Sequence, residues 1–219
     1  MIIKRDYYLK KIIDKRENGR IKIITGIRRC GKSYLLFNLY QEYLLSQGIK
    51  EEQIISIALD EIDNLEYRNP FRLNEYIKEK TKNRNQMYYI FIDEIQLSEA
   101  VSNPYIDSKE KNVTFVDVLL GLMKRNNVDI YVTGSNSKML SSDVLTQFRD
   151  RGNEIHVNPL SFAEVYDLYE NKESAFEHYI VYGGMPYIYS LKSDEEKNQY
   201  LKDLFRETYI KDILEIMLP

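Results

Sequence analysis

The chain has 219 residues, of which 43% are hydrophobic and 30% are charged. This apolar content suffices for one core-bearing domain with an appendage, or for two small domains. Lys and Arg number 31 against 34 Asp and Glu, so the net charge of −3 predicts no general attraction to nucleic acid or to an anionic membrane. The single cysteine, Cys30, excludes an internal disulfide and a cysteine-based zinc site.

No apolar run is long enough to span a bilayer, and no signal-peptide pattern opens the chain. We therefore expect a cytoplasmic protein without a membrane partner. Within the first 20 residues, an amphipathic helix is predicted from the apolar positions Tyr7, Tyr8, Leu9, Ile12 and Ile13.

The next stretch predicts a strand, a turn and a helix in direct succession. Ile21, Ile23 and Ile24 form a β-branched run typical of a buried strand, and apolar residues recur at helical spacing from Tyr34 to Leu44, until Gly48. Between them, residues 26–33 read GIRRCGKS, which fits the phosphate-binding loop pattern G-x-x-x-x-G-K-[ST], or Walker A motif. A glycine-containing turn before an ordinary helix is the alternative, and the strand–loop–helix order favours the phosphate loop.

The chemistry of a triphosphate explains this pattern. Glycines let backbone N–H groups approach the phosphate oxygens, Lys32 reaches the β- and γ-phosphates, and the Ser33 hydroxyl binds Mg²⁺. Cys30 is expected to be an alkylation-sensitive loop residue, because Lys32 and a helix N-terminus lower a thiol pKa. The residues predicted to contact the nucleotide here are Gly26, Ile27, Arg28, Arg29, Cys30, Gly31, Lys32, Ser33 and Tyr34.

Two carboxylates follow a later apolar strand. A second strand is predicted at residues 54–59, followed by a loop at 64–69 and a helix at 71–82, and then residues 88–94 read YYIFIDE, which ends as a Walker B motif does. Asp93, at a strand tip beside the phosphate loop, is predicted to hold Mg²⁺, and Glu94 to activate the attacking water. The alternative is that both residues simply cap a loop.

The remaining core elements come in the same alternation. Residues 96–112 are expected to form an exposed loop, and residues 113–125 a helix. Residues 129–133 are expected to form a third strand, whose end carries small polar side chains, and residues 154–157 the last strand. Asn136, after the third strand, either reports on the γ-phosphate or caps the next helix. His156 and His178 are far apart in sequence, so a metal site is not expected there.

The C-terminal residues carry no strand pattern. Helices are predicted at residues 162–169 and 174–182, then a Gly-Gly-Met-Pro turn and a long helix from about residue 194. This arrangement predicts a small helical lid.

The segments TGIRRCGKS, YYIFIDE, YVTGSNS, HVNPLSFAEV and YGGMP together resemble the AAA+ ATPases, in particular the bacterial and archaeal group with a C-terminal domain of unknown function. The resemblance implies that Asn136 is the sensor residue, with Ser135 as the fallback. It also implies that Arg151 is donated to the site of a neighbouring subunit, although two arginines in a charged loop are usually solvated. The resemblance also implies that Pro186 lies against the adenine. The alternative, an ordinary helix-breaking turn at this position, is weighed equally.

Together these patterns predict an α/β fold of the P-loop NTPase type, with a parallel five-stranded sheet sandwiched by helices and a small helical lid. Residues 1–160 would form the ATPase core, and 161–219 the lid and the start of a truncated region. The predicted function is Mg²⁺-dependent ATP hydrolysis coupled to conformational change, with ATP and Mg²⁺ as cofactors and catalytic roles for Glu94, Lys32, Asn136 and Arg151. The alternative is a nucleotide-controlled switch with little hydrolysis.

A small-molecule kinase is disfavoured by Glu94, and adenine is preferred because no Asn-Lys-x-Asp motif follows the strands. The role of Arg151 would make the protein a homo-oligomer, but the sequence does not specify the oligomeric state. It also does not specify the client, whether protein or nucleic acid. The last helix carries an apolar stripe from Leu201 to Ile216, and similar proteins continue beyond it. We expect the chain to dimerise or aggregate through residues 201–217.

Overall fold

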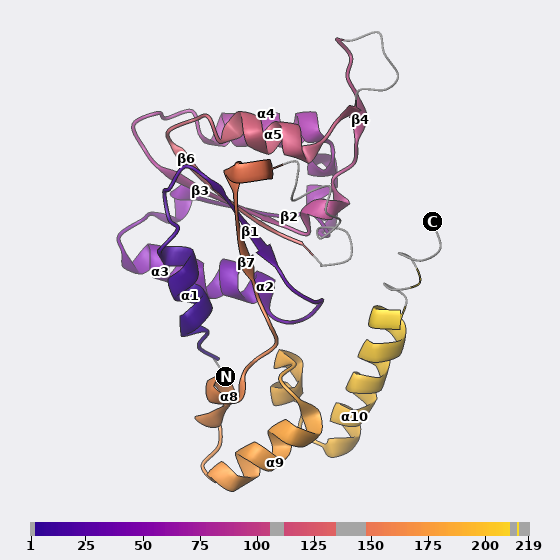
Figure 1. The fold of residues 1–219 in the computed structure, drawn as a ribbon. Helices are drawn as coiled ribbons and strands as arrows, with labels where there is room; N and C mark the ends of the chain where they lie inside the picture. The colour runs from indigo at the N-terminus through magenta and orange to yellow at the C-terminus, as the bar shows by residue number, and fades with distance from the viewer. Residues whose placement is uncertain (1–2, 106–111, 135–147, 211–213, 215–219) are drawn as a thin grey trace.

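The computed structural model describes residues 3–105, 112–134, 148–210 and 214. Its centre is a sheet of five strands, and every neighbouring pair in it is parallel. Helices cover both faces of this sheet (Figure 1), which confirms the predicted α/β fold. In spatial order the strands are β2 (Ile54–Ala58), β3 (Tyr88–Asp93), β6 (Val128–Thr133), β1 (Ile21–Thr25) and β7 (Gly152–His156).

The inner strands of the sheet are buried on both faces, which is why the sequence predicted them well. Every residue of β1 and β3 is buried, because a parallel sheet is covered on both faces and its strands are mostly apolar. Ile90 and Ile92 face one helical layer, whereas Tyr89 and Phe91 face the other. This alternation follows from the two-residue period of a strand.

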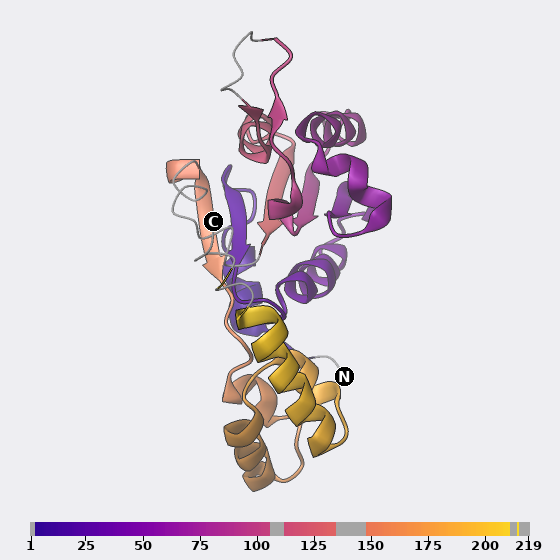
Figure 2. The same ribbon diagram turned by 90° about the vertical axis from the view of Figure 1, so that its right-hand side faces the viewer.

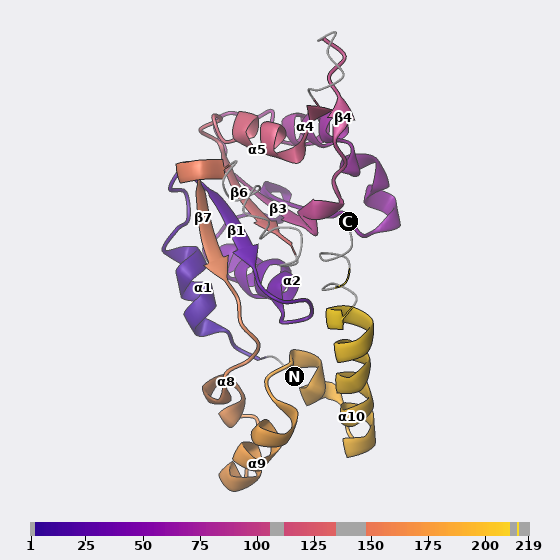
Figure 3. The same cartoon turned by 45° about the vertical axis from the view of Figure 1, so that its right-hand side comes forward.

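One layer consists of α4 (Pro70–Lys80) and α5 (Phe115–Leu122). The other consists of α1 (Asp6–Ile13) and a continuous helical stretch formed by α2 (Lys32–Tyr34), the π-helix η1 (Leu35–Tyr40) and α3 (Gln41–Ser46). Figure 3 shows α1 and α2 on the side of the sheet opposite α4 and α5. The stretch that begins at Lys32 is thus anchored along its length to the core.

Two regions differ from the predicted loops. Residues 62–68 form a 3₁₀-helix, η3 (Ile62–Arg68), where Asn64 Nδ2 and Arg68 Nε donate to the carbonyls of Ala58 and Leu59, at 3.0 and 2.7 Å. In the region of residues 96–112, β4 (Val101–Ser102) pairs antiparallel with β5 (Asn112–Val113), and the 3₁₀ turn η4 (Ile95–Leu97) lies at its start. Another short 3₁₀ turn, η2 (Glu51–Gln53), precedes β2. The polar composition that suggested loops instead supplies side-chain bonds and turns.

The C-terminal helices lie together beyond one end of the sheet (Figure 2). Ser161, Asn171 and Ser193 each accept a backbone N–H at a helix start, as good N-caps do. We call residues 161–210 the C-terminal helical segment. It contains α8 (Phe162–Tyr166), α9 (Lys172–Tyr182), η6 (Pro186–Ser190), α10 (Asp194–Asp203) and the π-helix η7 (Leu204–Ile210).

The stripe predicted on the last helix is covered in part. Leu204 is buried against Met185 and Ile188, whereas Phe205 is 60% exposed and Ile210 is also exposed. Predicted aggregation through residues 201–217 remains untested, and much of that range lies outside the described residues. Among the helices the structure describes, none combines the length and apolar character needed to cross a membrane.

Candidate functional site

The loop of residues 26–33 leaves β1 and enters α2 through backbone conformations that require glycine. Gly26 has φ of 147° and Gly31 has φ of 97°, both in the region that L-residues rarely adopt. A Cβ on Gly26 would lie 2.2 Å from the Val157 carbonyl oxygen, so no side chain fits there. The two motif glycines are therefore demanded by the path of the chain.

Lys32 lies at the start of the helix with its ammonium inside this loop. The residue is 5% exposed, and its Nζ donates to the carbonyl oxygens of Gly26 and Ile27, at 3.0 Å each. The loop thus wraps the ammonium, and a positive charge is held at the helix N-terminus where anions bind.

The expectation for Cys30 was wrong. Its side chain is fully buried, and its thiol donates to the Val157 carbonyl oxygen at 3.3 Å. Burial raises the pKa of the Cys30 thiol, against the opposing charges of Lys32 and Arg5. Sequence neighbours suggested a lowered pKa, but the packing of β7 over the loop dominates.

A cavity of about 610 Å³ opens beside the loop and joins residues from distant parts of the chain. It brings together four predicted nucleotide contacts, Arg29, Gly31, Tyr34 and Pro186, and the Pro186 Cγ lies 3.6 Å from an ideal Cβ on Gly31. Its aromatic and apolar lining with few polar groups is typical of small-molecule sites. The lining residues that sequence reasoning missed are Ile3, Arg5, Leu160, Tyr187, Tyr189 and Ser190.

Other predicted contacts lie around this cavity. Ile27 packs partly buried between the sheet core and the Met185 cluster, and the Arg28 carbonyl accepts from Tyr209 Oη at 3.5 Å. Arg29 has a positive φ of 65°, and its guanidinium lies 5.9 Å from the centre of the Tyr200 ring on α10. The loop therefore touches the C-terminal helical segment directly.

The predicted magnesium ligand, Asp93, is the last residue of β3, and the predicted catalytic base, Glu94, follows it directly. Asp93 is only 8% exposed, and Glu94 has the left-handed conformation φ 51°, ψ 46°, which is costly for a residue with a side chain. Strand β6 lies between β1 and β3, so Asp93 is one strand further from the loop than the sequence suggested. The Glu94 carboxylate accepts a hydrogen bond from Gln96 Nε2.

Thr133, the last residue of β6, joins these carboxylates and was missed by sequence reasoning. Its side chain is buried, its hydroxyl donates to Asp93 Oδ1, and it accepts the backbone N–H of Glu94 at 3.4 Å. Thr133 could have been predicted from the sequence, because it is a polar residue at the end of an apolar strand, as Asp93 is. Asn136 and the fallback Ser135, which follow it, lie outside the described residues.

Arg151 is remote from its own loop. It ends the 3₁₀ turn η5 (Arg149–Arg151) and is exposed, and the next residue, Gly152, pairs with Ile21 at the start of β1. The 26–33 loop leaves the other end of β1, about 15 Å away at the rise of a strand. Arg151 is therefore not assembled with the other predicted site residues of its chain.

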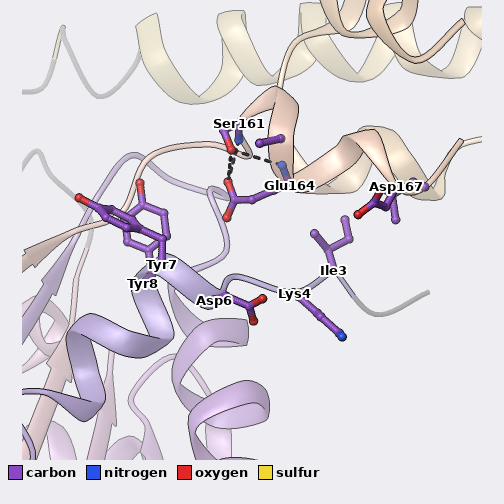
Figure 4. Close-up of a pocket in the computed structure, with 10 residues that line it drawn as sticks. Ile3, Lys4, Asp6, Tyr7, Tyr8, Ser161, Glu164 and Asp167 are labelled. Carbon is purple, nitrogen blue, oxygen red and sulfur yellow. Dashed lines mark hydrogen bonds between the residues drawn. The ribbon is translucent and has the colours of Figure 1, made fainter. Parts of the chain in front are cut away.

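Arg5 is the second residue that sequence reasoning missed. Its guanidinium is 2% exposed, lines the loop cavity and forms an ion pair with Glu164 of α8, with Nε to Oε1 at 2.8 Å. A second cavity of about 660 Å³ lies between residues 3–8 and α8 (Figure 4). There Glu164 accepts from the Ser161 backbone N–H and hydroxyl, at 2.8 Å each.

A loop that wraps a lysine at the carboxyl end of β1, in a parallel sheet covered on both faces, defines the P-loop NTPase fold. Consistent with this class, the model of the AAA domain family matches residues 18–166. The chain belongs to the AAA domain family.

Two curated relatives align with nearly the whole chain. An uncharacterized protein of Haemophilus influenzae is 31% identical over 97% of this chain and 50% of its own length. One from Methanocaldococcus jannaschii is 29% identical over 98% of this chain and 45% of its own length. The chain thus spans about half the length of the curated relatives it matches.

Two solved structures share the fold at low sequence identity. The Walker-type ATPase PABY2304 of Pyrococcus abyssi aligns with a TM-score of 0.53 and 16% identity, covering 98% of this chain and 71% of that one. Hsp104 of S. cerevisiae, solved with casein, aligns with a TM-score of 0.51 and 15% identity, covering 83% of this chain and 31% of that one.

Proposed function

We propose that the chain binds ATP with Mg²⁺ at residues 26–33 and hydrolyses it, and that turnover drives a conformational change. The observation that carries this proposal is the buried Lys32 ammonium held inside a glycine loop at a helix N-terminus. The β- and γ-phosphates would meet this charge and the backbone N–H groups of the loop. The neighbouring cavity, with Tyr34 and Pro186 in its wall, is suited to the base.

The residues present fit a magnesium ion. Mg²⁺ takes oxygen ligands and binds through one or two protein groups together with substrate phosphates. Ser33, beside Lys32, and the nearly buried Asp93 would hold it. When bound, the ion neutralises charge that develops on the transferred phosphoryl group.

Glu94 is proposed as the general base that takes a proton from the attacking water, with Asn136 as the sensor of the γ-phosphate. Thr133 bonds both the Asp93 carboxylate and the Glu94 backbone N–H, and so ties the backbone of Glu94 to Asp93. Arg151 would complete the site of a neighbouring copy, because it lies at the opposite end of β1 in its own chain. A homo-oligomer is part of this proposal.

A nucleotide-controlled switch with little hydrolysis is the second candidate. It is favoured by the Glu94 side chain, which is engaged by Gln96 in a left-handed turn and would have to leave this partner to act on a water. In either case we propose residues 1–160 as the nucleotide-binding core, 161–219 as the lid and start of a further region, and the cytoplasm as the location.

Two substitutions test the division of roles. Lys32→Ala should lose ATP affinity, whereas Glu94→Gln should keep affinity and lose turnover by about 10² or more. ATP binding would be measured by calorimetry and turnover by phosphate release, with the exposed Glu75→Gln on α4 as the matched control. Equal loss of binding in both site variants would contradict the assignment, and binding without turnover in the unsubstituted chain would favour the switch.

A further inference from the structure

Arg5 forms three charge-assisted hydrogen bonds to three separate parts of the fold. Its Nε donates to Glu164 Oε1 at 2.8 Å, its Nη1 to the Cys30 carbonyl at 2.9 Å, and its Nη2 to the Asn158 carbonyl at 2.8 Å. The guanidinium also lies 4.6 Å from the centre of the Tyr8 ring. An arginine has a rigid fork of donors suited to several acceptors at once, which a lysine lacks.

The hydrogen bond from Arg5 to the Cys30 carbonyl also fixes the orientation of the next backbone donor in the loop, the Gly31 N–H. Because a peptide group is planar and trans, holding the Cys30 carbonyl oxygen also fixes the direction of the Gly31 N–H, which points the opposite way. Gly31 has no side chain to steady its backbone and adopts φ of 97°. Arg5 therefore orients one of the N–H groups that a phosphate would meet.

The other two acceptors connect this loop to the C-terminal helical segment. Asn158 lies in the connection between β7 and α8, and its backbone N–H also donates to Tyr8 Oη at 3.1 Å. Glu164 lies in the first turn of α8 and accepts from Ser161 as part of a capping box. Movement of α8 would therefore shift an acceptor of the same guanidinium that holds Cys30.

The ion pair also separates two cavities. Arg5 lines the cavity beside the 26–33 loop, Glu164 lines the second cavity, and Ile3 lines both. The pair thus lies between the cavity beside the 26–33 loop and the cavity beside α8.

We propose that Arg5 is a positioning residue that couples the position of α8 to the phosphate-binding conformation of the 26–33 loop, with Glu164 as its partner. This inference rests on the proposed nucleotide site. Nucleotide in the cavity and the bond of Glu164 to Arg5 stabilise the same arrangement of the guanidinium, so each favours the other.

The test uses Arg5→Lys, which keeps the charge but loses the fork, and Glu164→Gln, which removes the ion pair but retains a capping-box side chain. MgATP affinity would be measured by calorimetry, and amide exchange followed over residues 26–34 and 161–170. In the unsubstituted chain MgATP should slow exchange in both segments. In each variant affinity should fall, about tenfold for Arg5→Lys, and saturating MgATP should protect the loop without protecting α8.

The double variant gives the sharper criterion. If the two side chains act as one unit, combining both substitutions should weaken MgATP binding no further than Arg5→Lys alone. The exposed pair Arg72–Glu75 on α4 supplies the matched controls Arg72→Lys and Glu75→Gln, which should change neither affinity nor α8 protection.

The outcomes separate this inference from the proposed function. A folded unsubstituted chain that does not bind MgATP refutes the proposed nucleotide site. MgATP binding with unchanged α8 protection in both variants, or with additive losses in the double variant, refutes the coupling role alone. If Arg5→Lys does not fold, Glu164→Gln decides through its own protection pattern, because it leaves the capping box in place.

Discussion

Thr133→Val replaces a buried hydroxyl with a methyl group of nearly the same shape. The substitution removes the donor to Asp93 Oδ1 and the acceptor for the Glu94 backbone N–H. A hydrogen bond to a charged group contributes about 1.5–3 kcal/mol, and the left-handed Glu94 loses a bond that helps to hold it. We expect the free energy of unfolding to fall by about 2 kcal/mol, which lowers the Tm by roughly 4–8 °C in a chain of this size.

Turnover should fall more than stability alone explains. The Glu94 backbone would no longer be tied to Asp93 through Thr133, so kcat for phosphate release should drop by about 10–100-fold. The Lys32 contacts are untouched, so affinity for ATP without magnesium should stay close to that of the unsubstituted chain. Urea unfolding, calorimetry and phosphate release would measure the three quantities.

The matched controls are Thr133→Ser, which retains the hydroxyl, and Thr81→Val. Thr81 is also fully buried, but its hydroxyl donates to the Ile77 carbonyl at 2.7 Å at the end of α4. Thr81→Val should cost about 1 kcal/mol and leave turnover unchanged. The reasoning is refuted if Thr133→Val matches Thr81→Val in both stability and turnover.

Two further predictions concern other parts of the chain. If Arg151 acts in trans, turnover per chain should rise with protein concentration, and mixing Arg151→Ala with Glu94→Gln chains should restore some activity; concentration-independent turnover would count against it. Burial, helped by Lys197 and opposed by Asp194, lowers the pKa of His178. The unfolded chain therefore takes up a proton near pH 6.5 that the folded chain does not, so the free energy of unfolding falls as the pH drops below about 7. In His178→Gln this fall should be smaller, as measured by urea unfolding at several pH values. The same dependence on acid pH in both proteins would contradict this prediction.

The sheet could be predicted because its physics is local. Parallel strands buried on both faces are mostly apolar, so β1, β3 and β6 are visible as stretches rich in Ile, Val, Tyr and Phe. The charged exceptions, Lys22 of β1 and Asp129 of β6, form a buried ion pair with each other. The glycines of the 26–33 loop were predictable for a similar reason, since the conformations of Gly26 and Gly31 exclude side chains. The order of the strands was not predicted, and with it the position of Asp93 relative to the loop.

Properties that depend on distant packing could not be predicted. The raised pKa of the Cys30 thiol comes from burial under the chain after β7, at a residue 127 positions away, while its sequence neighbours indicate the opposite shift. The 3₁₀-helix at residues 62–68 is held by side-chain bonds to the end of β2, which local propensity does not contain. In the first case a distant contact overrides the local pattern, and in the second, side-chain bonds to carbonyls six and nine positions earlier do so.

Arg5 shows this limit most clearly, and also why the limit matters for function. Two of its acceptors are backbone carbonyls, which carry no residue-type signal, and the third, Glu164, is 159 positions away in the sequence. A positively charged residue before an amphipathic helix looks like solvated surface, yet here it is buried between the loop, the connection at Asn158 and α8. A motif therefore locates the groups that we propose to meet the phosphates, whereas side chains that contact those groups from distant parts of the chain, as Arg5 does, are found only once the chain has folded.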